Sequence, residues 1–305
     1  MAGKPKRAHR QRADGDRGGA SSGAVCVDAR ALRELLQVHE GFRLEDVDAS
    51  STPGFFRGKA AGKQALADGA EPLSDLQERL FAEGRGGGRR CVLLLLQGMD
   101  TSGKGGVMRH VIGAVDPQGV DMTAFKPPTA EERSHPFLWR IRKALPRPGQ
   151  IGVFDRSHYE DVLVARVHRT VEPAVWKRRY GAINRFEQEV VAKGTTLLKV
   201  MLHISPGEQR KRLLARLDRP DKYWKYDPGD LEERARWEDY QAAYQEALTR
   251  CNAPEAPWFV VPAGHKWYAR WAVYALLRDA LEQMDPQWPP AHFDVDEQRE
   301  RLLAT

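Results

Sequence analysis

The sequence VLLLLQGMDTSGKGG, residues 92–106, joins a short apolar run to a glycine-rich segment that contains one lysine. A buried strand that leads into G-x-x-x-x-G-K and then into a helix is the context that a phosphate-binding P-loop requires. The glycines let backbone N–H groups close on phosphate oxygens, the helix start adds partial positive charge, and the lysine neutralises a phosphoryl group. The alternative is a glycine-rich turn that merely links strand and helix. The pattern predicts a helix through Ala114 and phosphate binding by Gly98, Thr101, Ser102, Gly103, Lys104, Gly105 and Gly106.

The position after Lys104 departs from the usual P-loop pattern. A Ser or Thr there normally offers its hydroxyl to Mg²⁺, but this chain has Gly105. The ion would therefore need another ligand, and Asp100 within the loop is the candidate. A carboxylate so close to phosphates would be repelled by them unless a divalent cation stood between the two. Asp100 as an ordinary turn residue is the alternative.

A second motif is IGVFDRSHYED, residues 151–161. Its apolar run ends in Asp155, the position of a Walker B acid at the carboxyl end of a strand. Asp155 would hold Mg²⁺ or its water and could accept a proton, although an Asp after a strand can also cap a helix. Arg156 would bind the charge that is transferred. Glu160 and Asp161 either support a metal site or are first-turn acids that the helix dipole favours.

Apolar runs alternate with amphipathic stretches along the chain from Val25 onward. Near-continuous apolar strands are typical of a parallel sheet that is buried on both faces by helices. The sequence therefore predicts an α/β fold with a parallel sheet of about five strands. The predicted strands are Val92–Gln97, Ile151–Phe154, Thr196–Ile204, Trp258–Pro262 and a weaker Val120–Phe125.

Helices are predicted where apolar residues recur at helical spacing. They cover Ala29–Val38, Leu73–Ala82 and Pro173–Ala192, the last with a proline in its first turn. Asp230 and Glu233 have the spacing of a capping box and predict the start of a further helix. Its apolar stripe is Trp237, Tyr240, Tyr244 and Leu248.

The two ends of the chain differ from this core. Residues 1–24 are predicted to be a disordered basic tail, because the first 23 hold six Lys and Arg against two Asp and only small apolar residues. A solvated tail is the simpler interpretation, and a nucleic-acid-binding arm is the alternative. Residues 25–90 are expected to wrap the core as an N-terminal extension, or to form a separate small domain. A P-loop domain over 91–290 and a C-terminal tail over 291–305 complete the predicted division.

Composition excludes several classes of protein. The longest apolar run, Cys91–Leu96, is far shorter than the roughly 20 residues that cross a bilayer, so no membrane span is expected. No apolar segment follows the basic start, which argues against a secretory signal. Cys26, Cys91 and Cys251 are odd in number and far apart in the sequence. They argue against a disulfide framework or zinc site, and for a reducing, cytoplasmic compartment.

Basic residues gather after the predicted strand ends. One group comprises Lys126 after the weak strand and, on the next helix, Arg133, Arg140, Arg142 and Lys143. A second group lies on one helical face within residues 209–225: Arg212, Arg216 and Arg219, opposite Leu213, Leu214 and Leu217. A domain of near-neutral net charge that gathers cations in this way is suited to a polyanion larger than one triphosphate. A solvated basic face is the alternative.

Taken together, these motifs closely resemble polyphosphate kinase family 2. The resemblance covers most of the chain from about residue 30 to 290 and implies a P-loop kinase fold similar to thymidylate kinase, with a helical lid around 206–237. The matching segments are PGFFRGKAAGK (53–63), GMDTSGKGG (98–106), FKPPT (125–129), HPFLWR (135–140), GVFDRSHYEDVLVARV (152–167), RPDKYWKYDPGDLEERARW (219–237) and APWFVVPAGHKWYARWAV (256–273).

The resemblance implies Mg²⁺-dependent, reversible transfer of a phosphoryl group from inorganic polyphosphate to a nucleotide, with Mn²⁺ as the other candidate ion. AMP and ADP are the implied acceptors, with GMP and GDP as further candidates. Members of the family commonly form dimers or tetramers, so a homo-oligomer is expected.

The site residues are carried over from the resemblance one by one. Lys104 and its neighbouring amides hold phosphates, and Asp100 and Asp155 organise Mg²⁺ and the acceptor phosphate. Many relatives have Asn where this chain has Asp155, which leaves its role as a base open. Further implied residues are Arg156 at the transferring group, Arg216 and Arg212 on the lid helix, Lys126 in the polyphosphate channel and Arg133 among the phosphate ligands.

Two other classes of protein share part of the pattern. An ATP-dependent nucleotide or small-molecule kinase would have the same P-loop, and polyphosphate offered with AMP or ADP but without ATP separates the two. A nucleic-acid-binding protein would show salt-dependent affinity that is lost when residues 1–23 are deleted. Nucleic acid is not the expected partner.

Overall fold

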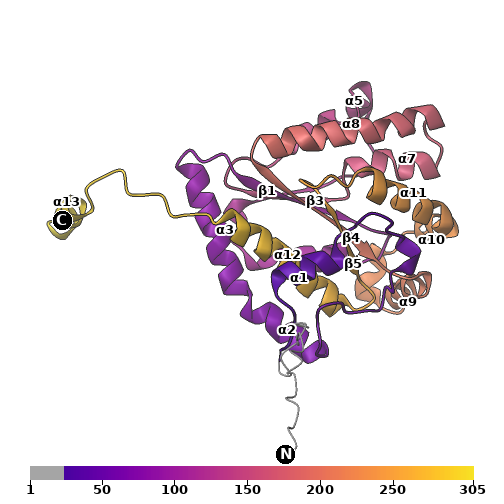
Figure 1. Cartoon of the computed structure of the whole chain (residues 1–305), viewed down its shortest axis with the longest axis horizontal. Helices are drawn as coiled ribbons and strands as arrows, with labels where there is room; N and C mark the ends of the chain where they lie inside the picture. Colours follow the sequence, from indigo (N-terminus) through magenta and orange to yellow (C-terminus); the bar gives the residue numbers. More distant parts are fainter. Residues whose placement is uncertain (1–23) are drawn as a thin grey trace, which may run out of the picture.

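A five-stranded parallel sheet forms the centre of the molecule (Figure 1). The computed structural model describes residues 24–305, so the predictions for the basic tail lie almost entirely outside the described residues. The five predicted strands are confirmed to within one residue at either end. In spatial order they are β2 (Val120–Ala124), β3 (Ile151–Asp155), β1 (Cys91–Gln97), β4 (Thr195–His203) and β5 (Trp258–Pro262).

The register of the sheet brings the two sequence motifs together. Leu96 of β1 lies opposite Asp155 of β3 on one side and Val200 of β4 on the other. The P-loop and the segment after β3 therefore leave the sheet at the same carboxyl edge, where open α/β sheets bind their ligands.

Helices cover both faces of the sheet, as the apolar strands predict. Side chains alternate between faces along each strand, so Leu94 and Leu96 join one apolar cluster while Leu93 and Leu95 join another. The first face packs against α1 (Ala29–Leu36), α2 (Lys59–Asp68), α3 (Ala70–Arg85), α4 (Lys104–His110) and α12 (Lys266–Met284). The second face packs against α7 (Val164–Val167), α8 (Pro173–Ala192) and α11 (Trp237–Arg250).

Residues 25–90 contribute directly to the first face. Leu32 and Leu36 of α1 and Leu73 and Leu80 of α3 are buried in the same cluster as the strand residues. A short 3₁₀ helix, η1 (Leu44–Asp46), lies between α1 and α2. The extension and the sheet thus share one core.

Two predicted helices are interrupted. The helix after the P-loop ends at His110 and gives way to a 3₁₀ turn, η2 (Ile112–Ala114), where Val, Ile and Gly are weak helix formers. After η3 (Pro117–Gly119) and β2, two short helices, α5 (Ala130–Ser134) and α6 (Trp139–Lys143), replace the single predicted one. Pro136 explains the break, because the residue before a proline avoids helical geometry and His135 is extended.

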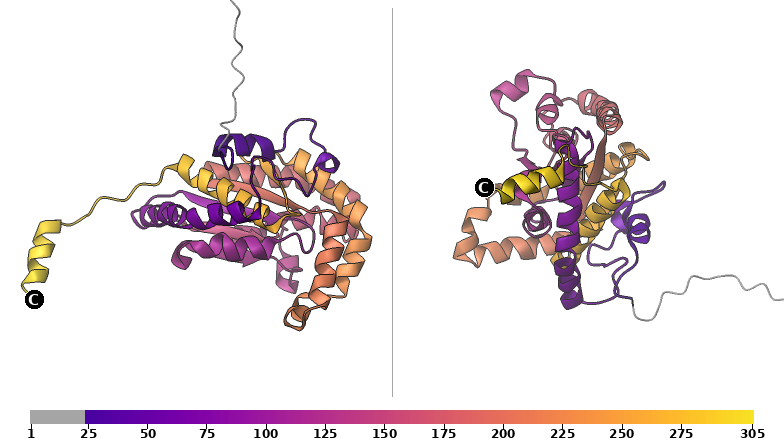
Figure 2. Two further views of the ribbon diagram at one scale, coloured as in Figure 1. Left: turned by 90° about the horizontal axis from the view of Figure 1, so that it is seen from below. Right: turned by 90° about the vertical axis from the view of Figure 1, so that its left-hand side faces the viewer.

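The predicted lid region comprises α9 (Pro206–Leu217), η5 (Pro220–Lys225) and α10 (Gly229–Ala235), which project beyond one side of the sheet (Figure 2). The predicted capping box is wrong, since no side chain caps α10 and the chain turns at Arg236 before α11 begins. Asp230 and Glu233 instead pair with Arg216 and His168. The apolar face predicted opposite the arginines is only partly buried: Leu213 is enclosed, whereas Leu214 and Leu217 are exposed.

The C-terminal residues stand away from the body. The segment after α12 leads away from the sheet to α13 (Val295–Leu303), as both figures show (Figures 1 and 2). The remaining short element, η4 (His158–Asp161), lies after β3. Leu302 and Leu303 are exposed by 74% and 82%. Among residues 24–305, the structure contains no helix with the length and apolarity of a membrane span.

Candidate active site

A cavity of about 570 Å³ lies over the P-loop. It is bounded by the loop itself, by the end of β3, by the lid and by the start of α12. Ten basic side chains line it against only two carboxylates, Asp100 and Asp155, so the cavity is strongly positive. The basic residues are Lys104, Arg109, Arg156, Arg212, Arg216, Arg219, Lys222, Lys225, Lys266 and Arg270.

A larger cavity of about 790 Å³ lies between η1, the end of β4 and α11. Its lining includes three carboxylates, Glu45, Asp48 and Glu238, and one arginine, Arg43. It shares no residue with the cavity over the P-loop. Because its charge disfavours phosphate, the smaller cavity is the candidate active site.

Glycine is required at two points of the P-loop. Gly98 has φ +143°, and a Cβ there would lie 2.5 Å from the carbonyl oxygen of Leu202. Gly103 has φ +118° and directly precedes α4. The first N–H groups of a helix have no partner within it, and the first turn of α4 borders the cavity. Lys104 Nζ donates to the Gly98 carbonyl at 2.9 Å, and the Gly98 N–H donates to the Tyr244 hydroxyl at 3.2 Å. The backbone thus has the shape of a phosphate cradle.

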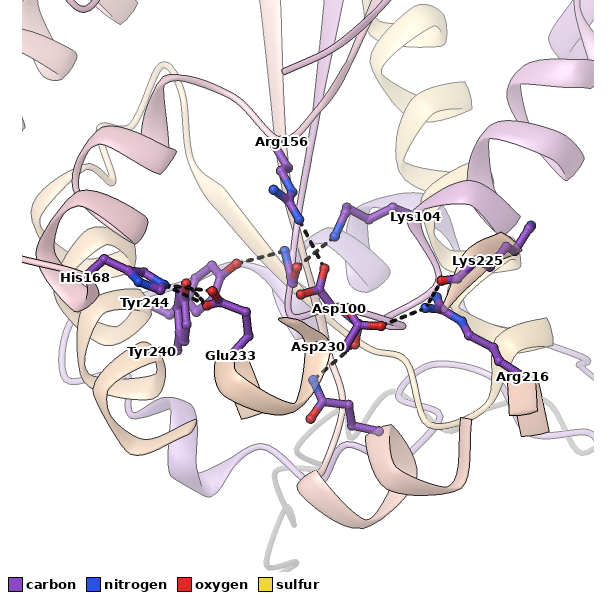
Figure 3. Close-up of polar contacts among 12 residues, drawn as sticks. Asp100, Lys104, Arg156, His168, Arg216, Lys225, Asp230, Glu233, Tyr240 and Tyr244 are labelled. Carbon is purple, nitrogen blue, oxygen red and sulfur yellow. Dashed lines mark hydrogen bonds and ion pairs between the residues drawn. The ribbon is translucent and has the colours of Figure 1, made fainter. Parts of the chain in front are cut away.

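Asp100 and Arg156 meet at the centre of the site (Figure 3). Arg156 Nη2 lies 3.2 Å from Asp100 Oδ1. Burial alone would lower the pKa of Arg156, but Glu160, Asp100 and Asp155 outweigh it and raise that pKa above its ordinary value. Burial raises the pKa of Glu160, with Arg156 and Lys104 acting in the opposite direction. The guanidinium therefore stays charged at the mouth of the P-loop.

Three buried polar atoms of the cavity lining lack a hydrogen-bond partner. They are Asp155 Oδ1, Thr101 Oγ1 and Ser102 Oγ. Buried polar atoms are usually satisfied, so unpaired ones in a cavity indicate a place for a ligand or ion. No cluster of three or more His, Cys, Asp or Glu suited to a metal occurs in residues 24–305. Asp100 and Asp155 fit Mg²⁺ nonetheless, since this ion is usually held by one or two carboxylates together with substrate phosphates and water.

Arg212 lies on α9 of the lid, as predicted, and its side chain is bonded to the backbone behind the P-loop. All five N–H donors of its guanidinium are occupied. Nη1 donates to the carbonyls of Thr101 and Ser102 at 2.9 and 3.0 Å, and Nη2 donates to those of Ala263 and Gly264 at 2.6 and 3.1 Å. Nε donates to Glu208 at 2.7 Å. Arg212 therefore supports the back of the P-loop and has no donor left for a substrate.

Arg216 lies in the lid, as predicted, and is bonded to other lid residues. Its Nη1 donates to the Lys225 carbonyl at 2.6 Å and lies 3.2 Å from Asp230 Oδ2. Burial and the nearby Asp100 raise the pKa of Asp230, and Arg216 acts against that shift. Figure 3 shows Asp230 close to Asp100, a proximity that the sequence interpretation of Asp230 as a helix cap did not anticipate.

Lys126 and Arg133 lie outside the cavity lining. Lys126 is exposed, and its carbonyl accepts from Arg140 Nη1 at 2.8 Å. Arg133 Nη1 donates to the Pro128 carbonyl at 2.6 Å. Lys126 lies in the loop after β2 and Arg133 lies on α5, and neither segment borders the cavity over the P-loop.

Three cations of the cavity were not predicted: Arg109, Lys266 and Arg270. Burial together with Arg212 and Arg270 lowers the pKa of Lys266, and burial with Arg109 and Arg212 lowers that of Arg270. Burial is the larger cause of both shifts, and the neighbouring cations act in the same direction. The sequence does carry a signal for two of them. Lys266 and Arg270 are four residues apart directly after β5, which places them on one face of the following helix.

The P-loop, the acidic pair at the sheet edge, the arginines and the helical lid define a phosphotransferase with a P-loop kinase fold. The chain belongs to the polyphosphate kinase 2 family, whose model, Polyphosphate kinase 2 (PPK2), matches residues 57–289. This confirms the resemblance predicted from the sequence motifs.

Solved and curated relatives agree with that assignment. A crystal structure of polyphosphate kinase 2 from Arthrobacter aurescens TC1 superposes with a TM-score of 0.90 at 54% identity, covering 93% of this chain and 100% of the other. The AMP/ADP-polyphosphate phosphotransferase of Meiothermus ruber is 45% identical over 81% of this chain and 91% of its own length. The ADP-polyphosphate phosphotransferase of Rhodopseudomonas palustris is 41% identical over 83% of this chain and 91% of its own length.

Proposed function

We propose that this protein transfers a phosphoryl group from inorganic polyphosphate to AMP and ADP, in a reversible reaction. The observation that carries the proposal is the cavity with ten cations and two carboxylates over a P-loop. Such a surplus of cations exceeds what one nucleotide needs and suits a donor that is a chain of phosphates. The AMP/ADP-polyphosphate and ADP-polyphosphate phosphotransferases above support the same donor, and the first of them supports both acceptors.

Positioning and charge neutralisation supply most of the catalysis in this proposal. An acceptor phosphate is already ionised at neutral pH, so the site needs no strong base. The P-loop amides and Lys104 hold the phosphates, and Arg156 stabilises the charge of the group in transfer. Asp100 and Asp155 would hold Mg²⁺, or Mn²⁺ in its place, which neutralises phosphate charge when bound. Asp155 is also the nearest candidate to take a proton, a role that the reaction does not require.

The lid would complete the site around the substrate. Arg216 is bonded to Asp230 and to the Lys225 carbonyl, and all three residues belong to the lid. A polyanion in the cavity offers Arg216 a negatively charged partner that it can bind with two parallel N–H groups, which the neutral Lys225 carbonyl cannot match. We expect lid closure to transfer Arg216 to the phosphates.

An acceptor panel tests this function directly. Purified protein is given long-chain polyphosphate as sole donor, Mg²⁺, and one of AMP, ADP, GMP or GDP, and the nucleotide products are separated by chromatography. We expect ADP from AMP and ATP from ADP, with slower conversion of the guanine nucleotides. Lys104→Ala should abolish transfer while leaving the thermal unfolding curve intact.

Absence of any product without ATP would reject the proposal in favour of an ATP-dependent P-loop kinase. A dimeric or tetrameric state and a cytoplasmic location accompany the proposal as predictions. Light scattering of the purified protein tests the first, and fractionation of cells that produce it tests the second.

A further inference from the structure

Residues 53–63, PGFFRGKAAGK, contain three cations that the proposed reaction does not use: Arg57, Lys59 and Lys63. All three are exposed. None of them has a carboxylate within 4.0 Å among residues 24–305, although many other arginines of the surface are paired, such as Arg30 with Glu34. These cations therefore have their full charge available to a partner.

The packing of α2 brings two of these cations to the active-site side of the molecule. Gly62 lies so close to Trp267 that a Cβ there would be 2.1 Å from the indole ring. Trp267 sits between Lys266 and Arg270 on the first turns of α12, and both of these line the cavity over the P-loop. Lys59 and Lys63 are four residues apart and share one face of α2.

The cavity connects to α2 through α4. Arg109 and His110 at the end of α4 line the outer part of the cavity. Burial lowers the pKa of His110, and Arg270, Arg109 and Lys63 lower it further. Charges from α12, α4 and α2 thus meet around one imidazole. Lys266, Arg270 and Arg109 line the cavity, Lys63 of α2 lies near enough to His110 to act on it, and Lys59 precedes Lys63 by one helical turn.

These cations have no ion-pair partner among residues 24–305, and gathering them is unfavourable by itself, because like charges raise each other's energy. A ligand that stabilises them must carry many negative charges in a row. The phosphates of one nucleotide would end near the P-loop, whereas a polyphosphate chain would leave the cavity and continue outward.

We propose that Lys59 and Lys63 on α2 form a distal subsite for inorganic polyphosphate, which holds the part of the chain beyond the cavity. The inference rests on the proposed function for the identity of the donor. It assigns a role to the 53–63 motif: α2 selects long chains over short ones, and it acts on binding and not on transfer.

Chain-length dependence tests this subsite. The variant Lys59→Gln/Lys63→Gln is compared with Arg185→Gln/Lys193→Gln. The second variant removes two exposed cations at α8, on the opposite face of the sheet, that have no ion-pair partner in the described part of the chain. Initial rates with ADP are measured with long-chain polyphosphate and with tripolyphosphate as donors. Both variants should keep the wild-type thermal unfolding temperature, since neither pair of side chains is buried.

We expect the α2 variant to raise KM for long-chain polyphosphate about threefold to tenfold, as the loss of two exposed charge contacts implies. Its kcat, its KM for ADP and its KM for tripolyphosphate should stay within about twofold of wild type. Added salt should reduce the difference from wild type, and Lys59→Arg/Lys63→Arg should restore affinity. The α8 variant should behave as wild type with both donors.

An equal rise of KM for both donors, or an equal effect of the α8 variant, would show a general field effect and overturn the subsite. Equilibrium binding of labelled long-chain polyphosphate without nucleotide gives an independent readout. If the wild type catalysed no transfer, the proposed function would fail while this titration still tested α2. Single-stranded RNA is titrated in the same way as a second polyanion. Unchanged polyphosphate affinity in the α2 variant would overturn the inference, whether or not RNA binding is lost.

Discussion

Gly105 occupies the P-loop position where a Ser or Thr is usual, and the structure shows room for a side chain there. A Cβ at Gly105 would meet no atom within 4 Å, and its φ is not positive. We predict that Gly105→Ser folds normally and stabilises the first turn of α4 by about 0.5 kcal/mol, because Ser has a higher helix propensity than Gly. Thermal unfolding measures this gain.

Gly98→Ala is the contrasting variant at the other end of the loop. Its new methyl group would collide with the Leu202 carbonyl, and φ +143° is unfavourable for alanine. Transfer activity should fall at least about tenfold because the cradle is distorted. A fully active Gly98→Ala protein would show that the loop does not need this geometry.

Arg212 illustrates how a charged residue can support a site without contacting substrate. We predict that Arg212→Lys destabilises the protein by about 1–3 kcal/mol, since a lysine has three donors and cannot serve five acceptors on three segments. Urea unfolding measures the loss, and KM for ADP should rise with it as the loop loosens. Arg210→Lys, at an exposed position of the same helix, is the matched control. A stability equal to wild type would contradict the supporting role.

At the scale of elements, the strands were predictable to within one residue, whereas the helix starts and side-chain contacts within the predicted lid were not. Both ends of β5 were predicted correctly, because its five consecutive apolar residues are typical of a strand that is buried on both faces. The P-loop and Asp155 were likewise predictable, because both signals are local in sequence. The positions of Lys266, Arg270 and Arg212 depend on helices that meet across distant segments, and no local pattern encodes such contacts.

The break between α10 and α11 shows the same limit. Asp230 and Glu233 have the spacing of a capping box, yet their carboxylates pair with Arg216 on α9 and with His168 at the end of α7. Tertiary contacts thus override a local preference, as they commonly do for weak signals. At α1, by contrast, the Asp28 side chain does cap the helix, by accepting from the Ala31 N–H.

A buried polar network joins β4 to α8 and to the segment after β3. Lys199 Nζ lies 2.6 Å from Glu187 Oε2 and 2.7 Å from the Cys251 carbonyl, and the Tyr159 hydroxyl donates to Glu187 at 2.7 Å. Lys199 is fully buried. Since Tyr159 follows Arg156 closely, this network anchors the chain that carries the arginine.

We predict that Lys199→Met destabilises the protein by about 3–5 kcal/mol because it leaves Glu187 buried without its cation. Lys199→Met/Glu187→Met should cost less than the single change, by about 1 kcal/mol or more. Urea unfolding of both variants checks the order. A double variant less stable than the single one would mean that the carboxylate stabilises through Tyr159 and His158 alone.

The same pair has a pH signature. Burial acts to raise the pKa of Glu187, but Lys199 and His158 outweigh it and lower that pKa below its ordinary value. A carboxylate with a lowered folded-state pKa stabilises the protein above its unfolded-state pKa, and that contribution is lost as pH falls through the folded-state value. The double variant should therefore lose less stability between neutral and acidic pH than the wild type.

At the scale of the whole molecule, the C-terminal arm stands out because it has little contact with its own body. Every residue of α13 is exposed except Gln298, which is partly exposed, and a nine-residue helix is marginal alone in water. We predict that truncation after residue 289 leaves the unfolding temperature of a monomer within about 2 °C of the full chain, since no buried apolar residue is removed.

Light scattering accompanies that measurement. If the predicted oligomer dissociates on truncation, the arm docks on a second copy of the chain. If the oligomer persists, its interface lies on the body. A large fall in unfolding temperature without any change in mass would contradict the view that the arm contributes little to the fold.

The order of strands in the sheet has a consequence for biosynthesis. β1 carries the P-loop at its end, yet its neighbour β4 begins about 100 residues later, which a ribosome takes roughly 5–20 s to add. Throughout that interval the nascent chain holds an apolar strand that lacks at least one of its two partners, and both until β3 is made. Tyr244, Arg212 and Lys266, which support the loop or line its cavity, emerge later still. The unfinished chain can therefore present the phosphate-binding sequence but not the phosphate-binding site, and its exposed strand edge is the part that a chaperone would need to cover until synthesis is complete.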